Sequence, residues 1–138
     1  MRYDRILRRV WVKIGEDEYA LSFNLSTIGK LDAMMNGQLI SRARTQDYPI
    51  QVLTEGFRDG LRNCDKGISL TAAKGLCEQF VLENGLQGLV LAFYGILAVS
   101  GLMGPKVTNQ MLKDIGMLNL DGEEKEEKPA KNETMPKG

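Results

Sequence analysis

Residues 86–103 read LQGLVLAFYGILAVSGLM, a stretch without a charged side chain, and the other segments are arranged around it. A membrane-spanning helix needs about 20 apolar residues, so a membrane span is one interpretation of this segment. A helix buried inside a protein is the other, since it is also apolar on all sides. The segment contains several glycines, ends in Gly104-Pro105 and is flanked only by Glu83 and Lys106. We favour the buried helix, because glycine adds little to membrane insertion and no cluster of Lys and Arg is present to orient a span.

The expected central helix has two contrasting faces. Small residues recur three or four apart on one face, which lets another helix approach closely; they are Gly88, Ala92, Gly95 and Val99. Bulky residues lie on the opposite face, and an ordinary core is one interpretation of them. The sharper prediction is that this face stays uncovered in the monomer and is buried by a partner or a second subunit. On that prediction the partner or oligomer interface consists of Leu89, Phe93, Ile96, Leu97 and Met103.

Length and composition narrow the class of protein. The chain has 138 residues, the size of a single domain, and its 18 basic and 18 acidic residues give zero net charge. No overall field therefore steers it to nucleic acid. Cys64 and Cys77 are the only cysteines and histidine is absent, which excludes a Cys/His zinc site. The two cysteines are expected as small buried residues, and the absence of a signal-peptide pattern predicts a cytosolic location.

The N-terminal residues 1–9 form a basic arm. One interpretation of its arginines is a contact with nucleic acid, but no aromatic platform accompanies them, so we favour a solvated face. Its apolar residues are spaced as on one face of a helix, which predicts a short amphipathic helix. These residues are Tyr3, Ile6 and Leu7, followed by Val10.

Residues 10–24 give the clearest strand signal. Apolar residues alternate with others on both sides of the polar turn Gly15-Glu16-Asp17-Glu18, which predicts a β-hairpin. A lone hairpin is only marginally stable in water, so it must pack on the helices or pair with another chain.

Capping residues and apolar periodicity predict the helices that follow. Ser26 is the expected N-cap of a first helix that ends at Asn36-Gly37, and Pro49 opens a second one. Ser69 caps a third, ended by Asn84-Gly85, and a weaker helix covers residues 108–115.

We therefore expect a mainly α (α+β) domain over residues 1–120. It consists of the hairpin and a compact bundle of four to five short helices over residues 26–118. Residues 121–138, DGEEKEEKPAKNETMPKG, are predicted to be a disordered charged tail. In the second helix, apolar residues recur at helical intervals: Ile50, Leu53, Phe57 and Leu61.

Catalytic signatures are missing from the sequence. Without histidine there is no Ser-His-Asp or Cys-His arrangement. No serine lies in a G-x-S-x-G elbow, and no glycine-rich phosphate-binding motif occurs. We expect a protein that is not an enzyme and has no cofactor and no metal ion.

The order of the segments resembles that of the tail assembly chaperones of long-tailed bacteriophages and prophages. The similarity covers residues 10–104: a hairpin written VWVKIGEDEYALSFNL, a helix written STIGKLDAMMNG, short helices, and an apolar helix with Ser-Gly near its end. Its most telling part is a strand followed by an apolar pattern that closes on glycine. In this chain the pattern is Phe23, Ile28, Leu31, Met34 and Gly37.

The resemblance implies a non-enzymatic protein of the host bacterial cytoplasm. Such a chaperone coats the apolar helical tape measure protein, keeps it soluble and recruits tail tube subunits, and a homo-oligomer is expected. In that family a translational frameshift often makes a longer form, and the chain after Leu120 is compatible with this. Two other classes remain open: a structural head-tail connector or tail-terminator protein, and a small membrane-associated protein held by residues 86–103.

Overall fold

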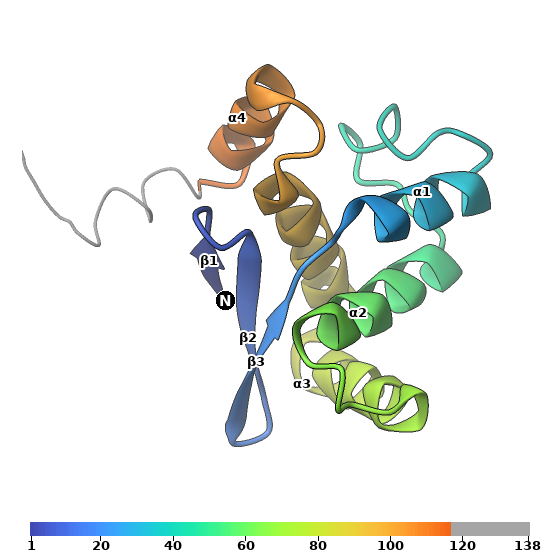
Figure 1. Ribbon diagram of the computed structural model, residues 1–138, viewed down its shortest axis with the longest axis vertical. Coiled ribbons are helices and arrows are strands. Elements are labelled where there is room, and N and C mark those ends of the chain that lie inside the picture. The colour runs from blue at the N-terminus through green and yellow to red at the C-terminus, as the bar shows by residue number, and fades with distance from the viewer. Residues whose placement is uncertain (117–138) are drawn as a thin grey trace, which may run out of the picture.

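The computed structural model describes residues 1–116, and the predicted charged tail lies outside them. Within the described residues, a three-stranded antiparallel sheet is followed by four helices (Figure 1), which confirms the expected class. The strands are β1 (Arg2–Asp4), β2 (Arg9–Ile14) and β3 (Asp17–Leu21). The helices are α1 (Leu25–Met34), α2 (Ile50–Cys64), α3 (Leu70–Ser100) and α4 (Pro105–Asp114).

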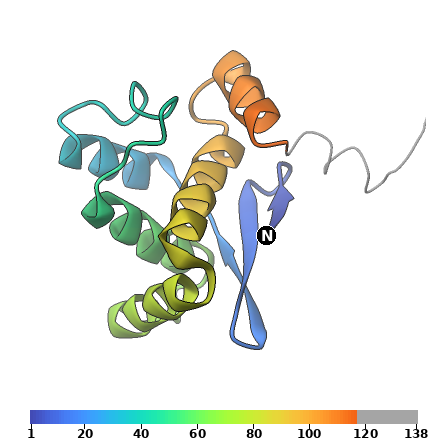
Figure 2. The same ribbon diagram turned by 180° about the vertical axis from the view of Figure 1, so that it is seen from behind.

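The predicted hairpin is confirmed as β2 and β3, with Val12 opposite Tyr19. One face of this hairpin is buried through Val10, Val12 and Ile14 of β2 and Leu21 of β3. Both α2 and α3 pack on the sheet (Figure 2), α2 against β3 and α3 against β2, so the hairpin packs on helices of its own chain. Of the two possibilities that the sequence left open for the hairpin, packing on the helices is therefore the one observed.

The predicted N-terminal helix is wrong, because residues 2–4 form the strand β1. Tyr3 lies opposite Val10 of β2, and its side chain packs against the core. The Leu7 N–H donates to Asp4 Oδ1 at 2.9 Å, and Arg8 has a positive φ of 58°, so the chain reverses between the strands. A helix of so few residues is marginal in water, whereas pairing with β2 satisfies the backbone cooperatively.

Helix α1 begins two residues earlier than predicted. Asn24, rather than Ser26, is the N-cap: its side-chain oxygen accepts the Thr27 N–H at 2.8 Å. Asparagine caps helices as well as serine does, and residue 24 has an extended backbone and lies three residues after the end of β3. The predicted end is confirmed, since Asn36 and Gly37 have positive φ of 55° and 80°.

Helices α1 and α2 are joined by ion pairs. Lys30 Nζ of α1 lies 2.7 Å from Glu55 Oε2 and 2.6 Å from Asp59 Oδ2, both on α2. Pro49 immediately precedes α2 as its N-cap, close to the predicted position. The segment between the two helices is not fully exposed, because Leu39 and Ala43 are buried in the core.

Helix α3 is kinked at Gly85, where φ is 77° and ψ is 171°. Ser69 caps it as predicted, accepting the Ala72 N–H at 3.0 Å. The expected break at Asn84-Gly85 is thus a kink, after which the helix continues to Ser100. Every residue from 92 to 100 is buried, against β2, α2 and α4.

By length and composition alone, α3 could cross a membrane, and 44% of its most apolar window is buried inside the molecule. The core helix of a soluble protein passes the same test. Burial of residues 92–100 by the chain's own elements favours the core helix.

An aromatic cluster forms the centre of the core. The ring of Phe93 lies 5.4 Å from that of Phe23 and 4.7 Å from that of Tyr48, measured between centroids. Gly56 of α2 makes room for this ring, because a Cβ atom there would lie 2.5 Å from Phe93 Cε2. Helix α4 closes one end of the core with Met111 and Leu112.

Candidate functional site

The structure places most of the predicted partner interface inside the core. Leu89, Phe93, Ile96 and Leu97 each have 0% of their surface exposed, and Met103 is partly buried against the core. The sheet, α2 and α4 cover residues 92–100 of α3, so a partner cannot reach Phe93, Ile96 or Leu97 without opening the fold. The structure therefore agrees with the core-helix alternative and not with a partner surface at these residues.

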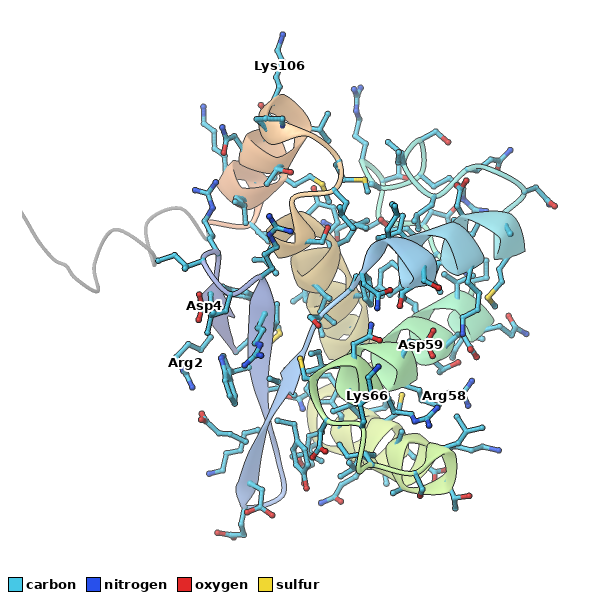
Figure 3. All side chains as sticks on the ribbon, in the orientation of Figure 1. Arg2, Asp4, Arg58, Asp59, Lys66 and Lys106 are labelled. Carbon is cyan, nitrogen blue, oxygen red and sulfur yellow. The ribbon has the colours of Figure 1, made fainter. Side chains whose placement is uncertain are left out.

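A different apolar surface lies between α2 and α3, around the kink at Gly85. It is a groove of about 450 Å³, and Arg58, labelled in Figure 3, stands on its α2 side. We call it the α2/α3 groove. The groove is lined by Ile50, Thr54 and Arg58 of α2 and by Lys74, Cys77, Glu78, Val81, Leu82, Leu86 and Leu89 of α3.

Helical periodicity explains which residues reach the groove. Ile50, Thr54 and Arg58 are four residues apart and share one face of α2. The opposite face packs into the core through Val52, Leu53, Gly56, Phe57, Gly60 and Leu61. On α3, the lining residues come from both sides of the kink at Gly85, so the kink shapes the groove.

The groove has an apolar floor and apolar walls. Cys77 and Leu89 are buried in the floor, while Ile50, Leu82 and Leu86 are 48%, 82% and 52% exposed. Single exposed apolar residues are ordinary, but a cluster around one concave surface marks a binding site. Burial raises the pKa of Cys77 to about 11, so this thiol stays neutral and is a poor nucleophile.

The rim of the groove carries both signs of charge. Arg58 pairs with Glu55, with 2.7 Å between Nη2 and Oε1. Glu55 also binds Lys30, and the hydrogen bond from Lys30 holds the pKa of Glu55 below its ordinary value. Lys74 and Glu78 lie one turn apart on α3. This mixed rim favours an apolar ligand with polar flanks over a purely anionic or cationic one.

The groove has the character of a helix-binding site. Among residues 1–116, no cluster of Cys, Asp and Glu could hold a metal ion. An apolar groove between helices, with a polar rim, is the site that amphipathic helices use when they dock through residues three or four apart.

The sequence interpretation missed the three exposed walls of the groove. Ile50 shares the helical spacing of the buried residues Leu53 and Phe57, but it faces outward at the start of α2. Val81 and Leu82 are adjacent on a helix, so their side chains cannot both point into the core. This adjacency is the one feature of the sequence from which the solvent exposure of Leu82 could have been predicted. Leu89 alone belongs to both the predicted interface and the groove.

Comparison with known proteins adds no relative. The chain matches no protein-family model, no curated protein and no solved structure. The α2/α3 groove and the sequence pattern are therefore the features that bear on function.

Proposed function

We propose that the protein is a phage or prophage tail assembly chaperone that binds apolar helical segments of the tape measure protein in the α2/α3 groove. The observation that carries the proposal is the ring of exposed apolar residues around the groove floor: Ile50, Leu82 and Leu86. In this proposal the protein has no enzymatic activity and no cofactor. It acts in the host cytoplasm and also recruits tail tube subunits.

The surface is of a suitable size for reversible binding. Full burial of an aliphatic side chain contributes about 1.5–3 kcal/mol, and the exposed parts of the three wall residues together amount to fewer than two such side chains. Burying them contributes roughly 3–5 kcal/mol before the costs of association are subtracted. One groove therefore binds weakly, and a long client would be held by several copies, each on its own helical segment.

The test is co-expression of the full chain with an insoluble, apolar helical fragment of a candidate tape measure protein. We expect a soluble complex that co-elutes in size-exclusion chromatography. A polar helical fragment of equal length, already soluble alone, is the matched control and should elute separately. If the apolar fragment stays in the pellet, the proposed chaperone function is wrong.

A further inference from the structure

Within residues 1–116, the helices leave one face of the three-stranded sheet open. Helices α2 and α3 pack on the other face, where Val10, Val12 and Leu21 are buried. Successive residues of a strand point to opposite faces, so the neighbours of these buried residues point outward. Figure 3 shows two of them, Arg2 and Asp4, on the side of the sheet away from α2 and α3. The outward residues, which we call the open face, are Arg2 and Asp4 of β1, Arg9, Trp11 and Lys13 of β2, and Glu18 and Ala20 of β3.

An aromatic side chain stands at the centre of the open face. Trp11, on the middle strand, lies opposite Arg2 of β1 and opposite Ala20 of β3. The Arg2 guanidinium carbon lies 5.0 Å from the centroid of the Trp11 ring, and Arg2 Nη2 lies 3.1 Å from Glu18 Oε1. Ala20 has only a methyl group, so it leaves space beside the indole on the side of β3. The partly exposed indole is therefore a platform with a cation close to it.

Cations without ion-pair partners surround this platform. Arg9 and Lys13 lie two residues before and after Trp11, about 6.8 Å along the strand in each direction, and Arg8 precedes them in the turn. Among residues 1–116, none of Arg8, Arg9 and Lys13 forms an ion pair. Asp4 lies opposite Arg9, but its side chain accepts a backbone N–H of the turn. The open face and its adjoining turn therefore offer three cations to a negatively charged partner.

A nucleotide of a single strand fits both features. Every base has a flat face that stacks on an aromatic side chain, and every nucleotide carries a phosphate that Lys or Arg can neutralise. In a duplex the bases are already stacked on one another, so a single strand presents them better. The apolar helix proposed for the α2/α3 groove has no charge that would use these cations. An acidic peptide would pair with the cations but has no flat group to cover the indole.

We propose that the open face binds single-stranded nucleic acid, with one base stacked on Trp11 and the adjoining phosphates held by Arg9 and Lys13. The sequence interpretation found no aromatic platform beside the arginines of residues 1–9, and the pairing of β1 with β2 supplies it by placing Trp11 opposite Arg2. The chain has no net charge and the site contacts few phosphates, so binding is strongest at low salt. The open face is separate from the α2/α3 groove, and this inference does not rest on the proposed function.

The test uses the fluorescence of Trp11, the only tryptophan of the chain. The full chain is titrated at low ionic strength with an oligothymidylate of about ten nucleotides, a length typical of single-strand sites. Stacking of a base should quench the indole fluorescence, and added salt should weaken the binding. A duplex of equal length, with its bases stacked internally, should leave the fluorescence unchanged. The proposal is overturned if the single strand does not quench the fluorescence or if the duplex quenches it equally.

Matched substitutions separate stacking from charge, with binding measured by the anisotropy of a labelled oligothymidylate. Trp11→Ala should weaken binding roughly tenfold, because one base loses its stacking partner. Lys13→Gln should weaken binding and reduce the slope of log affinity against log salt by about 0.7, as expected for one phosphate contact on a single strand. Lys66→Gln, in the exposed loop between α2 and α3, should change neither the affinity nor the slope.

Two further comparisons decide the outcome. Leu82→Glu, in the α2/α3 groove, should bind the oligothymidylate as the unmodified chain does, so failure of the proposed function and failure of this inference are distinguishable. If Lys13→Gln has the same affinity and the same salt slope as Lys66→Gln, the cations of the open face do not hold phosphates and the proposal is wrong. This comparison holds even if Trp11→Ala does not fold.

Discussion

Gly56 shows how a single residue determines the packing of the core. A Cβ atom at this position would lie 2.5 Å from Phe93 Cε2 and 3.2 Å from Phe23 Cζ, so the close approach of α2 to α3 requires glycine. Gly75, on the exposed side of α3, has no atom within 4 Å of the same position. These two glycines therefore have opposite roles in stability.

Gly56→Ala should lower the free energy of unfolding by about 1–3 kcal/mol, because the Phe93 ring must move within a packed core. Gly75→Ala should raise it by about 0.5–1 kcal/mol, since alanine favours a helix and meets no neighbour. Urea unfolding of both variants measures the difference. A Gly56→Ala protein as stable as the unmodified chain would contradict the packing of Phe93 against α2.

Glu83 links α3 to the turn of the hairpin and makes stability depend on pH. Both of its carboxylate oxygens lie 3.1 Å from the Gly15 nitrogen, in the turn between β2 and β3. This hydrogen bond, and a weaker effect from Gln79, hold the pKa of Glu83 below its ordinary value. A lowered pKa in the folded state stabilises the fold above the unfolded pKa of about 4.3, and this stabilisation is lost as the pH falls through the lower folded value.

Glu83→Gln should therefore reduce the loss of stability between pH 7 and pH 3. The measurement is the urea midpoint at both pH values, compared between the variant and the unmodified chain. Glu16→Gln removes an exposed carboxylate from the same turn and should keep the original pH dependence. Equal pH dependence in all three proteins would rule out the bond between Glu83 and Gly15 in solution.

At the scale of elements, the kink in α3 joins the core to the candidate site. The helix before Gly85 contributes Lys74 to Leu82 to the α2/α3 groove, and the helix after it contributes Leu86 and Leu89. The combination of φ 77° and ψ 171° is open almost only to glycine. A side chain at residue 85 must either strain the backbone or straighten the helix.

Gly85→Ala should lower the free energy of unfolding by about 1–3 kcal/mol, although a Cβ atom there meets nothing within 4 Å. Gly75→Ala is the matched control on the same helix. Urea unfolding measures the free energy of unfolding. Co-elution with the tape measure fragment measures whether the α2/α3 groove still binds. If alanine at residue 85 stabilises the protein as it does at residue 75, α3 is straight in solution and the groove has a different shape.

Local signals predicted most of the elements but not their exposure. The alternation of apolar with other residues predicted the hairpin. Ser69 and Asn36-Gly37 correctly predicted helix ends, because caps and turns depend on neighbouring residues. The strand β1 was missed because Tyr3 and Val10 meet only after a turn that Asp4 stabilises. The candidate site was missed for a related reason: whether Phe93 or Leu82 faces solvent depends on where α2 and the sheet pack.

At the scale of the whole molecule, the chain buries the central part of its most apolar segment and leaves a smaller apolar surface open at the α2/α3 groove. Residues 92–100 of α3 are enclosed, while the α2/α3 groove remains open within residues 1–116. Phe93→Glu should consequently unfold the protein rather than produce a folded monomer, because the charge would be buried and unpaired. Loss of the cooperative urea transition measures this outcome, and a folded Phe93→Glu protein would contradict the enclosed core.

The most direct test of the central claim compares Leu82→Glu with Leu25→Glu in complex formation with the apolar tape measure fragment. Both leucines are highly exposed, at 82% and 72%, but only Leu82 lines the groove. Size-exclusion chromatography with light scattering should show both variants folded, with the complex lost only for Leu82→Glu. If Leu82→Glu still holds the fragment as well as Leu25→Glu does, the α2/α3 groove is not the binding site.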